Sequence, residues 1–181
     1  MMKQLLPLFL TITFLFSCGN PSNTNRSEQQ NNSISVCDND LYHYCVKVVS
    51  ISDGDTFRGL TEDNEEIKFR IYGIDAPEKH QAFGNRSTQY FADLIFGKDV
   101  GIKVQKTDYF GRQVVWVYTP DGKDVSAEML KAGMAWHFKK YDKSDEYASL
   151  ENSARQKRLG LWADKNPIPP WEFRRNKKRR R

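Results

Sequence analysis

The stretch SISDGDTFRG, residues 50–59, places two carboxylates, Asp53 and Asp55, on either side of a glycine among strand-forming residues. Asp-Gly in such a setting is a strong hairpin signal, because glycine adopts positive φ at little cost and aspartate bonds nearby backbone. A simple turn is therefore one interpretation. The other is a metal site, because hard divalent cations prefer carboxylate oxygens as ligands.

Further charged residues stand near the ends of neighbouring predicted strands. FRIYGIDAPE carries Arg70, Asp75 and Glu78, and TDYFGR carries Asp108 and Arg112. Each has an ordinary explanation when taken alone, as a solvated strand charge, a turn former or an acid at a helix start. Together they suit phosphodiester hydrolysis: carboxylates hold a cation, planar arginine forks bind phosphate oxygens, and a glutamate orients or deprotonates water.

Hydrophobic periodicity predicts the elements that position these residues. Strands are expected over residues 44–57 with an interruption at DGDT, 67–72, 100–105 and 112–119; helices are expected over 85–97, 125–133 and 144–158. Asn85 is the expected N-cap of the first helix. Alternation along the 67–72 strand turns Arg70 away from its apolar side. The pattern fits an α+β fold, a five-stranded OB-type β-barrel with about three helices.

The chain from about Val46 to Trp162 resembles the staphylococcal nuclease-like, or thermonuclease, family. The motifs VVSISDGDTF, FRIYGIDAPE, TDYFGR, LKAGMAW and RLGLW occur in that family's order and approximate spacing. DGDT and R-x-x-x-x-D-x-P-E are specific when found together. The resemblance implies an OB barrel with three helices and Ca²⁺-dependent hydrolysis of DNA and RNA that leaves a 5′-hydroxyl and a 3′-phosphate.

The resemblance also implies a metal site. By motif match, Asp55, Asp75 and the backbone carbonyl of Ala76 are the expected Ca²⁺ ligands, and Asp53 is expected to act on the water around the ion. Ala76 replaces a more usual threonine, which is harmless if only its carbonyl is used.

Three charged residues carry the implied catalytic roles. Glu78 resembles the family's water-activating or water-positioning residue, and Arg70 and Arg112 resemble its phosphate-binding arginines. Phe110 stands where the family often places a tyrosine.

Tyr109 and Tyr141 are the candidate substitutes for the missing phosphate-binding hydroxyl. The loop after Glu78, KHQAFGN, is short, which affects the contacts expected of a substrate loop.

Two other classes of function fit parts of the sequence: a non-catalytic OB-fold module that binds nucleic acid, and a surface adhesin that uses only the basic tail. Four carboxylates beside a phosphate site argue against both, because they repel a polyanion unless a cation lies between.

The N-terminus predicts export. Lys3 precedes an apolar-rich run of twelve residues, Leu5 to Phe16, too short to span a bilayer core of ~30 Å. Residues 1–18 are therefore predicted to be a signal peptide. Leu15-Phe16-Ser17-Cys18 resembles a lipobox, so Cys18 is the predicted lipidation site; the alternative is an ordinary signal peptide from which Cys18 is removed.

The rest of the chain divides into three parts: a flexible polar linker over residues 19–35, a nuclease-like domain over 36–165 and a basic C-terminal tail over 166–181. We expect a monomer anchored in a membrane, facing the periplasm or the cell surface, or secreted if it is not anchored. In such an oxidising compartment Cys37 and Cys45 suit a disulfide; the alternative is two unpaired buried thiols.

Positive charge is concentrated in the tail. The last ten residues hold seven Lys or Arg and one Glu, whereas the whole chain has a net charge of +5, so the remainder is close to neutral. Such a run attracts nucleic acid, anionic lipid or acidic polysaccharide, or is simply solvated and disordered.

Overall fold

The computed structural model describes residue 37 and residues 41–179. The predicted signal peptide, Cys18 and the polar linker lie outside the described residues. Among the helices of the described part, none has the length and apolar character that crossing a bilayer requires.

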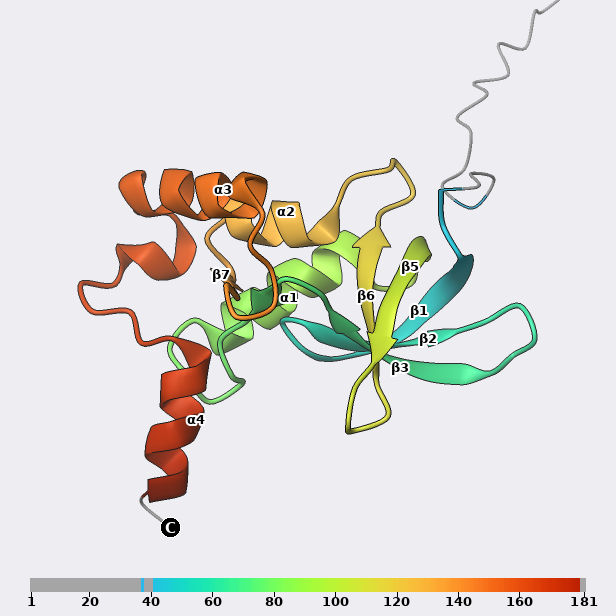
Figure 1. The fold of residues 1–181 in the computed structure, drawn as a ribbon, viewed down its shortest axis with the longest axis horizontal. Coiled ribbons are helices and arrows are strands. Elements are labelled where there is room, and N and C mark those ends of the chain that lie inside the picture. The colour runs from blue at the N-terminus through green and yellow to red at the C-terminus, as the bar shows by residue number, and fades with distance from the viewer. Residues whose placement is uncertain (1–36, 38–40, 180–181) are drawn as a thin grey trace, which may run out of the picture. The chain divides into compact units, whose positions relative to one another are not determined.

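Five strands form a closed barrel (Figure 1), which confirms the predicted α+β fold. In order around the barrel they are β1 (Tyr44–Asp53), β2 (Thr56–Leu60), β3 (Glu66–Ile71), β6 (Gln113–Tyr118) and β5 (Asp99–Thr107). Pairing of β1 with β5 closes the barrel, and only β3 and β6 run parallel. Aromatic packing fills the interior, where the rings of Phe57 and Phe69 stack with centroids 4.9 Å apart.

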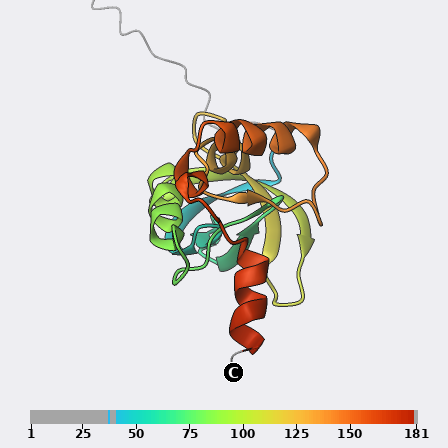
Figure 2. The same cartoon turned by 90° about the vertical axis from the view of Figure 1, so that its left-hand side faces the viewer.

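Three helices lie close to where the sequence predicts them: α1 (Gly84–Ile95), α2 (Val125–Lys131) and α3 (Asp145–Gln156). A short 3₁₀ helix, Gly160–Ala163, follows. A further helix, α4 (Pro170–Arg179), forms within the predicted basic tail, whose order the sequence left open. Figure 2 shows α4, in red, pointing away from α2 and α3.

The predicted N-cap of α1 is wrong. The helix begins at Gly84, and the capping position is Phe83, which has a φ of 66° and no side-chain capping bond. A Cβ at position 84 would lie 2.0 Å from the carbonyl oxygen of Glu78. Glycine therefore fits here because the loop from Glu78 closes tightly on the helix start, and Asn85 falls inside the first turn.

A second, two-stranded sheet was not predicted. β4 (Ile74–Asp75) pairs antiparallel with β7 (Trp136–His137), so that Asp75 lies opposite Trp136. These strands are too short to leave an alternating pattern in the sequence. Their pairing ties the FRIYGIDAPE motif to the segment between α2 and α3.

Candidate active site

A cleft of about 880 Å³ brings the predicted site residues together. Its lining includes Asp53, Asp55, Arg70, Asp75, Ala76, Glu78, Tyr109, Arg112 and Tyr141, that is, every predicted metal, catalytic and substrate-binding residue. They come from the β1–β2 turn, β3, β4 and the loop after it, the β5–β6 loop and the segment after β7. The barrel thus gathers at one place residues that are far apart in the sequence.

The DGDT motif is both a turn and part of the cleft. β1 ends at Asp53 and β2 begins at Thr56, so Asp55 lies in the turn, where its backbone N–H donates to Oδ1 of Asp53 over 3.1 Å. Asp53 therefore ends the strand and Asp55 follows it in the turn, and both line the cleft. Gly54 does not have a positive φ, so backbone conformation does not explain why glycine stands there. The reason is space, because a Cβ at this position would lie 2.2 Å from Oγ of Ser87 on α1.

Arg70 links the two predicted metal ligands. Its Nη1 lies 2.5 Å from Oδ2 of Asp55, and its Nη2 donates to Oδ1 of Asp75 over 2.9 Å. Asp55 also accepts the backbone N–H of Ala76 over 2.6 Å, and its other oxygen accepts Oγ1 of Thr56 over 3.2 Å. These contacts fix the positions of both buried carboxylates.

The position of Asp75 depends on α3 through the small sheet. The backbone N–H of His137 on β7 donates to Oε1 of Glu151 over 3.1 Å. Glu151 is almost fully buried, and Arg155 pairs with the same oxygen over 3.2 Å. The guanidinium of Arg155 in turn lies over the ring of Trp136, 4.7 Å from its centroid. Sequence reasoning did not identify Glu151 as a support for the site, since nothing in its local pattern separates it from other helix acids.

Arg112 is held by its own loop. Nε and Nη2 of Arg112 lie 2.8 and 2.7 Å from Oδ2 of Asp108. Partial burial raises the pKa of Asp108, but its hydrogen bonds with Arg112 and its loop outweigh that effect and lower it. The carboxylate is therefore ionised and keeps the guanidinium in place at the edge of the cleft.

A third arginine enters the site from α4. Nη2 of Arg174 donates to Oδ2 of Asp75 over 2.6 Å, and Nη1 donates to Oε1 of Glu78 over 2.6 Å and to Oδ1 of Asp75 over 3.2 Å. No local pattern signals this role, because Arg174 stands in a run of basic residues of the same type.

The carboxylates of the cleft favour a cation. Burial, and then the charge of Asp55, raises the pKa of Asp53 to about 7. Burial also raises the pKa of Asp75, against the opposing effect of its bond with Arg174. Crowded carboxylates and the carbonyl of Ala76 are the donor types that Ca²⁺ takes, so the residues present fit this ion.

The described carboxylates do not converge on a preformed site, since no group of three or more His, Cys, Asp or Glu within the described ranges is arranged to hold a metal ion. Guanidinium groups lie between them instead: Arg70 between Asp55 and Asp75, and Arg174 between Asp75 and Glu78.

Exposed aromatic rings border the cleft. Tyr109 and Phe110, at the tip of the β5–β6 loop, are 97% and 77% exposed, and Tyr141 is 51% exposed. Nζ of Lys106 lies 5.0 Å from the ring centroid of Tyr141, and the guanidinium of Arg112 lies 5.5 Å from that of Phe110. Rings beside cations suit nucleobases, which stack on aromatic side chains.

Comparison with known proteins identifies the family of this chain. Residues 68–164 match the family described as Staphylococcal nuclease homologue. An "Uncharacterized endonuclease" of Haemophilus influenzae is 43% identical over 132 residues, which cover 73% of this chain and 74% of the relative. A "Micrococcal nuclease" of Shigella flexneri is 39% identical over 142 residues, covering 73% and 81%. An "Uncharacterized endonuclease" of Escherichia coli O157:H7 is 39% identical over 131 residues, covering 72% and 85%. The chain belongs to the staphylococcal nuclease homologue family.

Proposed function

We propose that this protein is a Ca²⁺-dependent endonuclease that hydrolyses the phosphodiester bonds of DNA, RNA or both and leaves 5′-hydroxyl and 3′-phosphate ends. The observation that carries the proposal is Arg70, which pairs with Asp55 and Asp75 in the same cleft as Glu78 and Arg112. Cation ligands and phosphate-binding forks within one cleft are the requirements of phosphodiester cleavage. The printed names of the relatives, endonuclease and nuclease, support it.

The metal role falls to the aspartates. Asp55, Asp75 and the Ala76 carbonyl would hold Ca²⁺, and the ion would supply positive charge beside the phosphoryl group. Asp53, bonded to the backbone of Asp55, holds the turn and the water around that position.

The chemical step falls to three charged side chains. Glu78 takes a proton from the attacking water, whose oxygen bonds to phosphorus as the bond from phosphorus to the 5′-oxygen breaks; the 5′-oxygen then takes up a proton. Arg70 and Arg112 bind the non-bridging oxygens and neutralise the charge that develops there. Asp108 keeps the guanidinium of Arg112 in one orientation before substrate arrives, which reduces the ordering cost.

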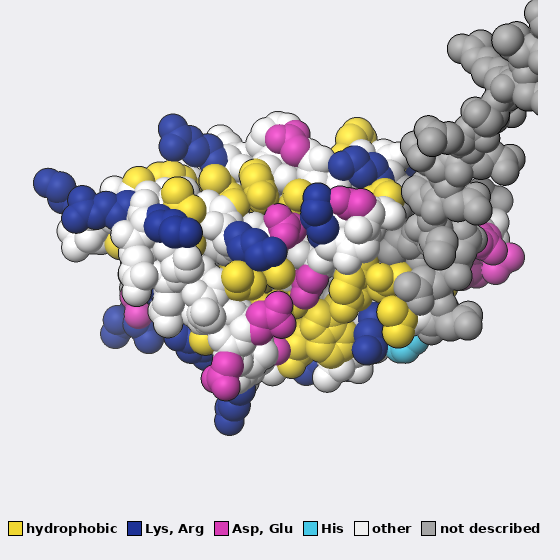
Figure 3. Space-filling view, turned by 90° about the horizontal axis from the view of Figure 1, so that it is seen from above, with side chains coloured by type: hydrophobic (Ala, Val, Ile, Leu, Met, Phe, Trp, Pro, Cys, Tyr) yellow, Lys and Arg dark blue, Asp and Glu magenta, His cyan; other side chains and the backbone are white. Residues whose placement is uncertain are grey.

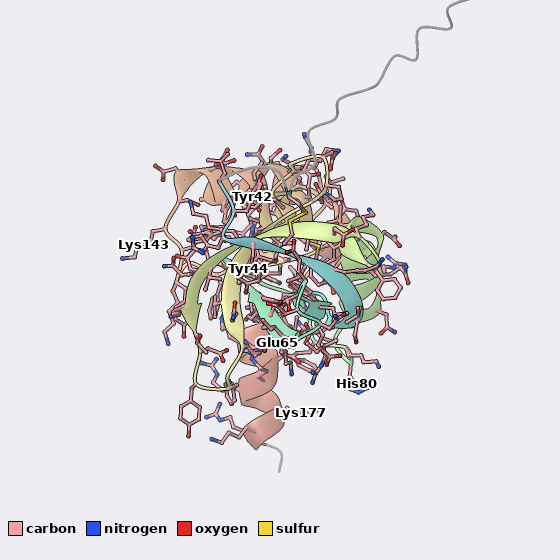
Figure 4. All side chains as sticks on the ribbon, turned by 90° about the vertical axis from the view of Figure 1, so that its right-hand side faces the viewer. Tyr42, Tyr44, Glu65, His80, Lys143 and Lys177 are labelled. Atoms are coloured by element: carbon pink, nitrogen blue, oxygen red, sulfur yellow. A yellow bond between two sulfur atoms is a disulfide. The ribbon has the colours of Figure 1, made fainter. Side chains whose placement is uncertain are left out.

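Charge near the cleft suits a polyanionic substrate. A second hollow, of about 330 Å³, lies between the loop after Glu78 and α4, and its basic lining residues include Lys79, Lys177 and Lys178. Figure 4 labels His80 and Lys177 on its two sides. The face seen in Figure 3, by contrast, mixes basic and acidic side chains. We infer that nucleic acid approaches along the α4 side, although anionic lipid would be attracted by the same residues.

The test uses the protein without residues 1–18, incubated with supercoiled plasmid and with RNA, in CaCl₂ or in chelator. We expect cleavage only with Ca²⁺, and ends that accept a 5′-label from polynucleotide kinase directly but support polymerase extension only after phosphatase treatment. Arg70→Ala is the inactive control. Equal DNA binding in Ca²⁺ and in chelator, without cleavage in either, would instead identify a non-catalytic binding module.

We also propose that the protein is exported, anchored through a lipid on Cys18 and monomeric. The apolar run of residues 5–16 and the lipobox-like LFSC support this placement. Without the anchor, the same signal peptide would direct secretion.

A further inference from the structure

Both carboxylate oxygens of Asp75 are engaged by arginine N–H groups. Oδ1 accepts bonds from Arg70 over 2.9 Å and from Arg174 over 3.2 Å, and Oδ2 accepts one from Arg174 over 2.6 Å. A cation that binds Asp75 needs one of these oxygens, and two positive groups cannot share it closely without strong repulsion. At least one of the two arginines must therefore give way.

Arg174 is the arginine that is free to leave. The side chain of Arg70 is 13% exposed and is also paired with Asp55, whereas the side chain of Arg174 is 46% exposed. Arg70 extends from β3, which is paired with β2 on one side and β6 on the other, while Arg174 extends from α4. Arg174 also bonds to Oδ2 of Asp75, whereas the bond from Arg70 goes to Oδ1.

The start of α4 is anchored, so Arg174 stays near the site when its side chain moves. The ring of Trp171 stacks on that of Phe138, with centroids 5.5 Å apart and planes 6° from parallel, and lies 5.6 Å from that of Trp136. Just before the helix, Nε2 of Gln81 donates to the carbonyl of Ile168 over 2.5 Å. Release of Arg174 therefore does not require the helix to leave.

We propose that Arg174 is an active-site residue that holds Asp75 and Glu78 in the cation-free protein and is displaced from Asp75 when a divalent cation binds. The cation and Arg174 then compete for the same carboxylate. Exchange also frees Glu78 from its pair with Arg174, which ties the availability of the water-activating group to cation binding. The inference rests on the proposed cation site but not on cleavage.

The test is calorimetric titration of the protein lacking residues 1–18 with CaCl₂ alone. Arg174→Gln removes the competitor, so we expect its Kd for Ca²⁺ to fall by about three- to tenfold, which corresponds to the net contribution of one typical hydrogen bond. Arg174→Lys keeps a competing charge without the fork, and its Kd should lie between those of the wild type and Arg174→Gln. Arg175→Gln is the matched control, because it removes the same charge from the next position of α4 and should change the Kd less than twofold.

Thermal unfolding gives a second, independent measure of Ca²⁺ affinity. Ca²⁺ should raise the Tm of Arg174→Gln more than that of the wild type, since a tighter ligand stabilises more at equal concentration. The inference is overturned if Arg174→Gln has the same Kd for Ca²⁺ as Arg175→Gln, or if it binds Ca²⁺ more weakly than the wild type. If that result accompanies Ca²⁺-dependent cleavage by the wild type, the proposed function stands; if no variant binds Ca²⁺ and none cuts, both fail.

Discussion

Arg112 and Asp108 form a two-point ion pair within one loop, with Nε and Nη2 of the arginine 2.8 and 2.7 Å from the same carboxylate oxygen. The other oxygen of Asp108 accepts the backbone N–H groups of Phe110 and Arg112, over 2.9 and 3.0 Å. The loop is thereby folded around the guanidinium that it presents to the cleft. A lysine at position 112 would keep the charge but could not reproduce this two-point contact.

Arg112→Lys should therefore slow cleavage by about 10²-fold, the cost of losing transition-state stabilisation of ~3 kcal/mol. The measurement is single-turnover cleavage with protein in excess over DNA. Arg58→Lys is the matched control, because Arg58 pairs with Glu66 in the open, away from the cleft. A change in affinity alone, with unchanged cleavage per bound complex, would remove Arg112 from the chemistry.

Glu78→Gln should lower the cleavage rate by about 10²-fold or more while DNA binding changes little, because the proposed partner of Glu78 is water. Binding is measured in Ca²⁺ by anisotropy at early times, and cleavage in the same buffer. Glu172→Gln on α4 is the control, since it removes the same charge from the helix that carries Arg174. Equal loss of rate in both variants would point to a general charge effect.

Asp75→Asn should raise the Ca²⁺ concentration needed for half-maximal cleavage, because it removes one unit of negative charge from the site. Added Ca²⁺ should restore part of the lost rate. The measurement is the rate across a CaCl₂ series, with Tm recorded in parallel because Asp75 is buried. A rate that stays low at every Ca²⁺ concentration in a folded variant would argue against a ligand role.

The stability of the cation-free protein should depend on pH through Asp53. Its pKa is raised from 3.8 to about 7, so between these values the folded protein binds more protons than the unfolded chain, and stability falls as pH rises. In chelator, the Tm difference between about pH 5 and about pH 8 should be larger for the wild type than for Asp53→Asn. Equal differences would show that Asp53 titrates normally in the folded protein.

The N-terminal cysteines offer a covalent test. The structure joins Cys37 to Cys45 by a disulfide with Cα atoms 5.6 Å apart, and Cys45 lies on β1 opposite Gly101 of β5, where the barrel closes. Mass spectrometry of the protein purified without reductant should show a deficit of two hydrogen atoms that reductant reverses. Free alkylation of both thiols without reductant would disprove the bond.

Replacing Cys18 by Ser should release the protein from the membrane fraction or leave its precursor unprocessed. Equal membrane retention of this variant and the wild type would count against lipidation.

Local sequence determined the barrel and most of the site. Alternation in β3 buries Phe69 and Ile71 and turns Arg70 to the other side, as predicted. In each strand, apolar residues alternate with polar ones according to which face is buried. The strand can therefore be identified from this period of two without knowing which strands it pairs with. Two contacts within the site are also local: the backbone N–H of Asp55 donates to Asp53, and Asp108 holds Arg112 within one loop. Resemblance was enough to name the motif residues.

Only the tertiary structure decided what surrounds those residues. Asp75 is supported by β7 and Glu151, and Arg174 reaches it across a sequence separation of 99 residues. Gly54 is required by the approach of Ser87, and Gly84 by the carbonyl of Glu78, although the sequence suggested turn conformation and a cap at Asn85. Such contacts join segments whose local patterns are independent of each other, so periodicity and spacing carry no record of them. The basic residues of the C-terminal tail cannot be told apart from the sequence. Only the fold shows that Arg174 is the one that contacts Asp75 and Glu78.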